Sequence, residues 1–236
     1  MTSLGIERWL VVVLVATHAG CSGATPDAKP VDSSDAPSAR KPTGGGMGTE
    51  AEVGGMNQDE VEKVFKRALG KLQGCQKDAS SRIPYVAGEV GFHVKVDRDG
   101  KPQQVDVTQS TMGDLETEKC MVDVIQGCQF PAPVGGKSGI ADVAGIDLPP
   151  VADVREPVPW SESDMGLGAK AAHAALRSCK QGSGSLKATL YVTTDGRIQS
   201  VGFSGDRNAA DCAADKLKRL KFNSPGSYAA KVSLDE

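Results

Sequence analysis

The feature that most constrains the fold of this chain is a pattern that occurs twice in the same order. Each copy has an apolar stripe at helical spacing that ends in a cysteine, an alternating strand, an Asp-Gly turn, a second strand and a second cysteine-bearing helix. The spacing from the second cysteine to a following phenylalanine is identical, Cys120 to Phe130 and Cys212 to Phe222. The repeated order predicts two tandem domains of one fold.

The first domain is expected over residues 57–148. Asn57, three residues before a glutamate, predicts a capping box, and Asp114 predicts the cap of the second helix. The expected helix, hairpin, helix and final strand lie at residues 57–75, 89–96, 103–108, 114–128 and 140–148.

The second domain is expected over residues 161–236, after an extended linker at 149–160 that is rich in proline and valine. The buried face of its first helix is expected to carry Leu167, Ala171, Ala175, Leu176 and Cys179. Asn208 is expected to cap its second helix. The elements are expected at residues 167–179, 186–192, 201–203, 208–220 and 227–234. The fold class is therefore α+β, with each short antiparallel sheet packed on two helices.

Matched positions in the two copies predict how the cysteines pair. Each copy has one cysteine at the end of its first helix and one early in its second, so we expect Cys75 to bond Cys120, and Cys179 to bond Cys212. Cys128 is left as a free thiol on the apolar face of its helix. The alternatives are an intermolecular disulfide through Cys128, a redox role for its thiol, and a Cys75–Cys128 bond.

The N-terminus is typical of an exported chain. A charged start, an apolar run at residues 9–16 and small residues before Cys21 predict a signal peptide over residues 1–20. The run is shorter than the roughly 20 residues that a transmembrane helix needs. We expect lipidation of Cys21, as in bacterial lipoproteins. Secretion without lipid is the alternative, because His18 stands where these sites usually have an aliphatic residue.

Residues 21–56 contain almost no large apolar side chains, so they are expected to form a disordered tether behind the lipid. The residue after Cys21 is Ser22 and not the aspartate that often retains lipoproteins at the inner membrane. This favours the outer membrane, facing the periplasm, and leaves the inner membrane open.

No catalytic, cofactor-binding or metal-binding constellation is present in the sequence. Net charge is -3, with no basic patch for nucleic acid. His93 is expected on the solvent face of a strand, and His173 in a packing role. The acidic residues at 97–99 and Asp195 fit hairpin turns better than a calcium loop. We therefore expect neither an enzyme nor a small-molecule substrate.

Several motifs of the first domain resemble those of a known family. They are Cys75, Gly88 to Gly100, Val105 to Thr111, Cys120, Phe130-Pro131, Pro133 and Gly135-Gly136. Together they resemble the C-terminal domain of the AgmX/PglI proteins of gliding bacteria, which is similar to the TonB C-terminal domain. Residues 161–236 look like a degenerate copy, with Phe222-Asn223 in place of Phe-Pro.

The resemblance implies an envelope module that binds other proteins and has a place in a gliding-motility or transport assembly. A small sheet with unpaired edges accepts a strand from a partner. We expect a lipid-anchored, non-catalytic, periplasm-facing interaction module. The alternative is a structural envelope lipoprotein that associates with itself through sheet edges or Cys128.

Overall fold

The computed structural model describes residues 51–151, 153–180 and 182–236. The segment Gly48–Glu236 is one compact unit that contains both copies of the repeat. The signal peptide, Cys21 and most of the expected tether lie outside the described residues.

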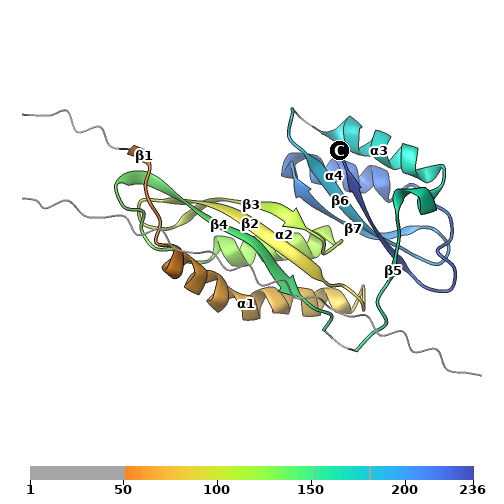
Figure 1. Cartoon of the computed structure of the whole chain (residues 1–236), viewed down its shortest axis with the longest axis horizontal. Helices are drawn as coiled ribbons and strands as arrows, with labels where there is room; N and C mark the ends of the chain where they lie inside the picture. The colour runs from red at the N-terminus through yellow and green to blue at the C-terminus, as the bar shows by residue number, and fades with distance from the viewer. Residues whose placement is uncertain (1–50, 152, 181) are drawn as a thin grey trace, which may run out of the picture. The chain divides into compact units, whose positions relative to one another are not determined.

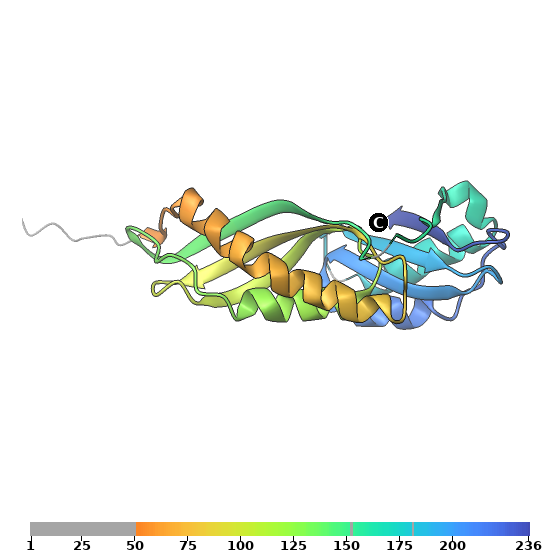
Figure 2. The same cartoon turned by 90° about the horizontal axis from the view of Figure 1, so that it is seen from below.

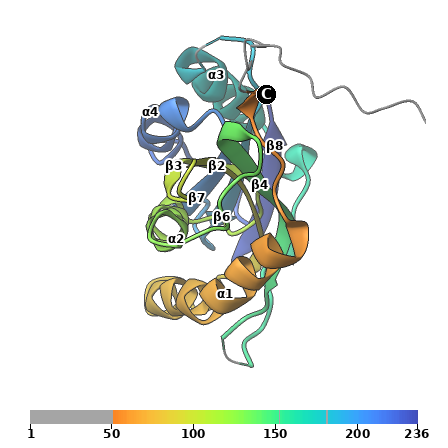
Figure 3. The ribbon, with the colours of Figure 1, turned by 90° about the vertical axis from the view of Figure 1, so that its left-hand side faces the viewer.

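The first half consists of a sheet in the order β1-β4-β2-β3 and two helices. Its elements are β1 (Ala51–Val53), α1 (Gln58–Ser80), β2 (Gly88–Asp97), β3 (Pro102–Ser110), α2 (Leu115–Gln126) and β4 (Gly136–Leu148). Both helices lie on the same side of β2, β3 and β4, as Figures 1 and 3 show. Figure 2 shows α1 running alongside α2.

The second half repeats this arrangement in the order β5-β8-β6-β7. Its elements are β5 (Val158–Pro159), a 3₁₀ turn η1 (Glu162–Met165), α3 (Gly168–Cys179), β6 (Leu186–Val192), β7 (Ile198–Gly205), α4 (Arg207–Leu217) and β8 (Ala230–Asp235). The prediction of an α+β protein with two similar halves is confirmed.

Each sheet has one strand more than the sequence predicts. Ala51–Val53 falls in the range assigned to the tether and pairs in parallel with β4, while Val158–Pro159 falls in the range assigned to the linker and pairs in parallel with β8. Both sheets are therefore mixed rather than antiparallel. Strands this short contain too few residues for an alternating pattern to identify them.

The helix caps agree with the sequence in the first half only. Asn57 accepts a hydrogen bond from the Glu60 amide (3.2 Å), and Asp114 accepts one from the Thr117 amide (3.1 Å). Only this half of the predicted capping box forms, because the Glu60 carboxylate accepts from the Lys63 ammonium (2.7 Å). In the second half the expectation for Asn208 is wrong, because Asp206 caps α4 and accepts from the Asn208 amide (3.1 Å).

The expected buried face of α3 also needs correction. Leu167 is 90% exposed and Ala171 is exposed, whereas Ala172, Ala175 and Leu176 are buried. Leu167 precedes the first helical residue, so it lies outside the apolar stripe. The predicted stripe is therefore confirmed at Ala175, Leu176 and Cys179 and wrong at its first two positions, Leu167 and Ala171.

One disulfide in each half ties its two helices together. Cys75 is bonded to Cys120 with the Cα atoms 5.9 Å apart, and Cys179 to Cys212 with the Cα atoms 5.7 Å apart. These are the pairs that the matched positions predict. Cys128 is free and partly buried, and its thiol donates to the Val124 carbonyl (3.3 Å).

Candidate functional site

The two halves make contact through the face of the second sheet that its own helices do not cover. This face carries small polar residues and one tyrosine. Thr189, Tyr191 and Ser200 belong to it, and all three are buried. The Ser200 hydroxyl donates to the Gly113 carbonyl (2.8 Å), and the Thr189 hydroxyl to the Ser110 carbonyl (3.4 Å). The loop between β3 and α2 therefore rests on the second sheet.

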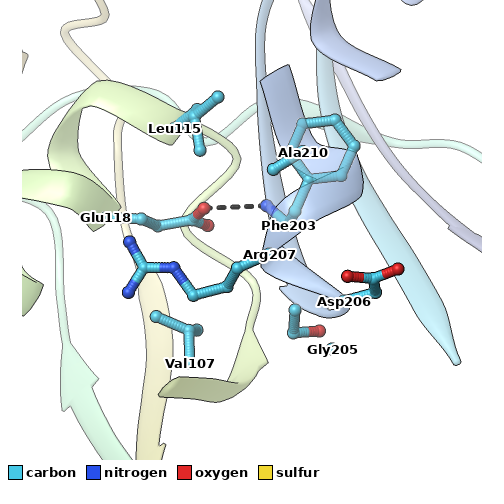
Figure 4. Close-up of a pocket in the computed structure, with 9 residues that line it drawn as sticks. Val107, Leu115, Glu118, Phe203, Gly205, Asp206, Arg207 and Ala210 are labelled. Atoms are coloured by element: carbon cyan, nitrogen blue, oxygen red, sulfur yellow. Dashed lines mark hydrogen bonds between the residues drawn. The ribbon is translucent and has the colours of Figure 1, made fainter. Parts of the chain in front are cut away.

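Glu118, on the first turn of α2, crosses this contact. Its carboxyl accepts a hydrogen bond from the Phe203 amide of β7 at 2.7 Å, as Figure 4 shows, and a second from the Ser110 hydroxyl. The residue is only 2% exposed. Gly202 permits this approach, because a Cβ at that position would collide with the Glu118 carboxyl and lie 2.8 Å from the Asp114 amide. A side-chain carboxyl thus occupies the place of a neighbouring strand at the edge of β7.

Burial governs the ionisation of Glu118. Desolvation raises the pKa of its carboxyl to about 8, and the hydrogen bonds from Ser110 and Phe203 offset only part of this effect. Asp114 raises the pKa further and Arg207 lowers it. The Arg207 guanidinium donates to the Val105 carbonyl of β3 (3.0 Å), so each half supplies a side chain to a strand of the other.

A perturbed carboxyl in a cleft would suggest catalysis, but this one lies beside a cavity of about 10 Å³. That volume is about what one water needs. Since no substrate fits there, the geometry favours a structural role for Glu118 in joining the halves.

The outer edge of β4 is the first of two surfaces with room for a ligand. β1 pairs with β4 only at Gly136 and Ser138. The Gly54 amide donates to the Ser138 carbonyl (2.7 Å), so the backbone groups of Ser138 point away from β2. Alternation places the backbone groups of Ile140 and Asp142 on the same outer edge. Among the described residues, neither has a backbone partner on that side.

A hollow of about 290 Å³ runs beside this edge, between the first turns of α1 and β4. Val61 and Phe65 of α1 and Val143 of β4 provide apolar walls, and Glu62 and Asp142 make its rim acidic. An added strand would place its side chains in this hollow.

The second surface is a groove of about 750 Å³ at the junction of the halves, which we call the junction groove. Tyr85, Trp160 and Lys231 line it, and the fully buried Tyr191 forms its floor. The Tyr85 ring packs against Tyr191 and Tyr228, with ring centroids 5.3 Å and 5.8 Å apart.

The histidines singled out in the sequence do not belong to any of these surfaces. His93 lies on the exposed face of β2, and its Nδ1 is 2.7 Å from a carboxylate oxygen of Asp142. The packing role expected for His173 is wrong, because its two ring nitrogens lie 2.9 Å from Glu236 and 3.0 Å from Glu162. Those carboxylates, Glu162 foremost, raise the pKa of His173.

Asp97 and Asp99 lie at the turn between β2 and β3. The Asp97 carboxylate accepts from the amides of Asp99 and Lys101 (2.9 Å each), which is hairpin-turn chemistry. Among the described residues no group of histidine, cysteine and carboxylate side chains could hold a metal ion. No helix in that part of the chain combines the length and the apolar character that crossing a membrane requires.

Sequence reasoning missed Glu118, Tyr191 and Lys231. Tyr191 offered the one usable signal, since an aromatic residue on the polar side of an alternating strand indicates that this side is also covered. The other two are ordinary charged residues whose burial depends on the contact between the halves.

Comparison of the chain with protein-family models, with curated proteins and with solved structures gives no match in any of the three. Fold and sites together define a class: a disulfide-bonded α+β protein of two similar halves with an open strand edge and a groove between the halves.

Proposed function

We propose that this protein is a lipid-anchored cell-envelope protein that acts as a non-catalytic, periplasm-facing protein-interaction module. The open outer edge of β4 carries the proposal. An unpaired edge beside an apolar hollow is the geometry that β-strand addition uses, with backbone hydrogen bonds for affinity and side-chain pockets for specificity.

The export signal and Cys21 support the placement in the envelope, and the two disulfides fit an oxidising compartment. The resemblance of residues 57–148 to TonB-type C-terminal domains supports a role in docking and a place in a gliding-motility or transport assembly. The outer membrane remains the expected location. The 10 Å³ cavity beside Glu118 supports a function without catalysis.

The test is a proline at the strand edge. Ile140→Pro removes an outward N–H but no hydrogen bond to β2, so it should leave the fold intact and abolish strand addition. Ile140→Val keeps the N–H and is the matched control. Cross-linking pull-down of the full-length tagged protein from intact cells, followed by mass spectrometry, should recover a partner with the wild type and the valine variant only.

Recovery of the same partner with Ile140→Pro would contradict strand addition at β4. Self-association is the second candidate, because two sheets in one molecule have open outer edges. Light scattering after size-exclusion chromatography separates the two: a stable homo-oligomer that Ile140→Pro dissociates would favour the structural lipoprotein.

A further inference from the structure

The junction groove contains a partly buried cation, Lys231, that has no anionic partner among the described residues. The Lys231 ammonium donates to the Ala87 carbonyl (2.7 Å) and lies 5.3 Å from the centroid of the Tyr191 ring. No carboxylate of the described residues lies within ion-pair distance of it. An ammonium has three donors, so two remain available to a ligand.

The surroundings of Lys231 hold this cation in a partly dry site. Burial lowers the pKa of Lys231 to about 8, and Glu156 at the rim raises it by a smaller amount. Tyr85 and Tyr191 do not act as anions here, since desolvation raises the pKa of both phenols, that of Tyr191 to about 12. The groove therefore favours one added negative charge beside Lys231.

A strand edge opens into the same groove. Leu186 and Glu236 exchange backbone hydrogen bonds (2.8 and 3.0 Å). Because bonded and non-bonded pairs alternate in an antiparallel ladder, Ser233, opposite Thr189, has its N–H and C=O directed away from β6. β5 pairs only with Ala230 and Lys231, so no backbone group of the described residues meets Ser233 on its outer side.

We propose that the junction groove binds an extended peptide segment that carries a carboxylate, with the carboxylate on the Lys231 ammonium and the peptide backbone along the edge of β8 at Ser233. Tyr85 and Trp160 supply aromatic walls, the side chains that most often anchor peptides and protein partners. The groove volume of about 750 Å³ lies in the usual range for bound ligands.

The acidic rim sharpens the specificity of the groove. Asp147 and Glu156 line its outer part and repel a second negative charge. A segment with a single carboxylate is therefore preferred over a polyacidic one. The groove touches only the C-terminal end of β4, at Asp147 and Leu148, and not the outer edge at Ile140 and Asp142. This proposal therefore stands if strand addition at that edge fails, and the reverse also holds.

The carboxylate can come from a chain terminus or from an Asp or Glu side chain, and three pools of N-acetylated random tetrapeptides separate these sources. The first pool has free C-termini and no acidic residues. The second is C-terminally amidated and contains one Asp or Glu, and the third is amidated without acidic residues. Affinity selection on the immobilised full-length protein should enrich members of the first or second pool and none of the third.

Variants of two lysines complete the test. Lys231→Gln removes the charge and keeps a donor for Ala87, so it should weaken binding of the selected peptides at least tenfold. Lys187→Gln is the control, because Lys187 is exposed on the same sheet face and paired with Asp235 (3.2 Å). Circular dichroism checks that both variants fold.

The pH dependence of peptide affinity separates a binding role of Lys231 from a purely structural one. A bound carboxylate stabilises the protonated ammonium, so affinity should fall up to tenfold per pH unit above about 8 in the wild type and stay level in Lys231→Gln. Equal enrichment of all three pools, no enrichment of any, or unchanged affinity in Lys231→Gln would overturn the proposal.

Discussion

The Glu118→Gln variant is expected to be more stable than the wild type at pH 8 and no more stable at pH 5. Glutamine keeps the shape of the side chain and an acceptor for the Phe203 amide. Its NH₂ group donates to the Ser110 hydroxyl oxygen, in place of the bond that the Glu118 carboxyl accepts from Ser110. The variant loses only the ability to ionise inside the contact between the halves. Because the carboxyl is buried, its charged form is the costly one.

The direction in which stability changes with pH follows from proton binding to Glu118 in the folded and unfolded states. The pKa of Glu118 is about 8 in the folded protein and about 4.5 in the unfolded chain, so between these values only the folded state keeps the proton. The free energy of unfolding of the wild type should therefore fall as pH rises through this window, by up to about 1.4 kcal/mol per pH unit. Above about pH 8 the contribution levels off.

His173 titrates in the same direction and must be separated from Glu118. Its pKa is raised by Glu162 and Glu236, so its contribution is present at low pH and is lost as pH rises through that raised pKa. Subtracting the free energy of unfolding of the wild type from that of Glu118→Gln cancels the contribution of His173, because both proteins contain His173.

Urea unfolding of the full-length protein with intact disulfides, at steps between pH 5 and pH 8.5, measures the effect. Asp123→Asn is the matched control, since Asp123 is exposed on the same helix. Its pH profile should follow the wild type. Parallel profiles for Glu118→Gln and wild type would show that Glu118 is not the buried, protonated group that the contact between the halves requires.

Local patterns in the sequence were sufficient for most of the fold. Alternation predicted both hairpins, the helical stripes predicted four helices, and matched cysteine positions predicted pairs that the structure contains. Each of these signals lies within one element or one repeat. Asp206 capping α4 in place of Asn208 marks the ordinary error of such signals, a shift of a residue or two at a boundary.

The contact between the halves could not be predicted in this way, because the corresponding faces of two similar sheets differ in burial. The face of the first sheet is exposed, whereas that of the second is covered by the other half. Lys95 and Tyr191 stand at the same distance before the turn glycines Gly100 and Gly196. Lys95 is exposed and Tyr191 is fully buried. In a sequence pattern both occupy polar-side positions, and only the second sheet accepts the loop before Asp114.

The free face of the first sheet differs from the covered face of the second in the same way. The free face of the first sheet carries exposed charged and polar side chains, among them the His93–Asp142 pair. It lacks the glycine that lets Glu118 approach β7. Packing another element on this face would require desolvating those charges.

Removing the Cys179–Cys212 disulfide should lower the free energy of unfolding by about 4 kcal/mol, because the bond closes a loop with a sequence separation of 33. A domain of ordinary stability has only about 5–15 kcal/mol. The second half has little reserve, since eight of the buried residues in its core cluster are alanines. In Cys179→Ala/Cys212→Ala we therefore expect the second half to open before the first.

Hydrogen exchange followed by mass spectrometry tests both the size and the place of this loss. Amides of α3, α4 and β6–β8 should exchange on the order of a hundredfold to a thousandfold faster, as about 4 kcal/mol allows if part of the opening is local. Amides of α1 and β2 should change less. Cys128→Ala, which removes the free cysteine, should leave exchange in both halves near wild type. Equal acceleration in both halves would contradict local opening, and would mean that the Glu118 contact joins them into one cooperative unit whose stability depends on either disulfide.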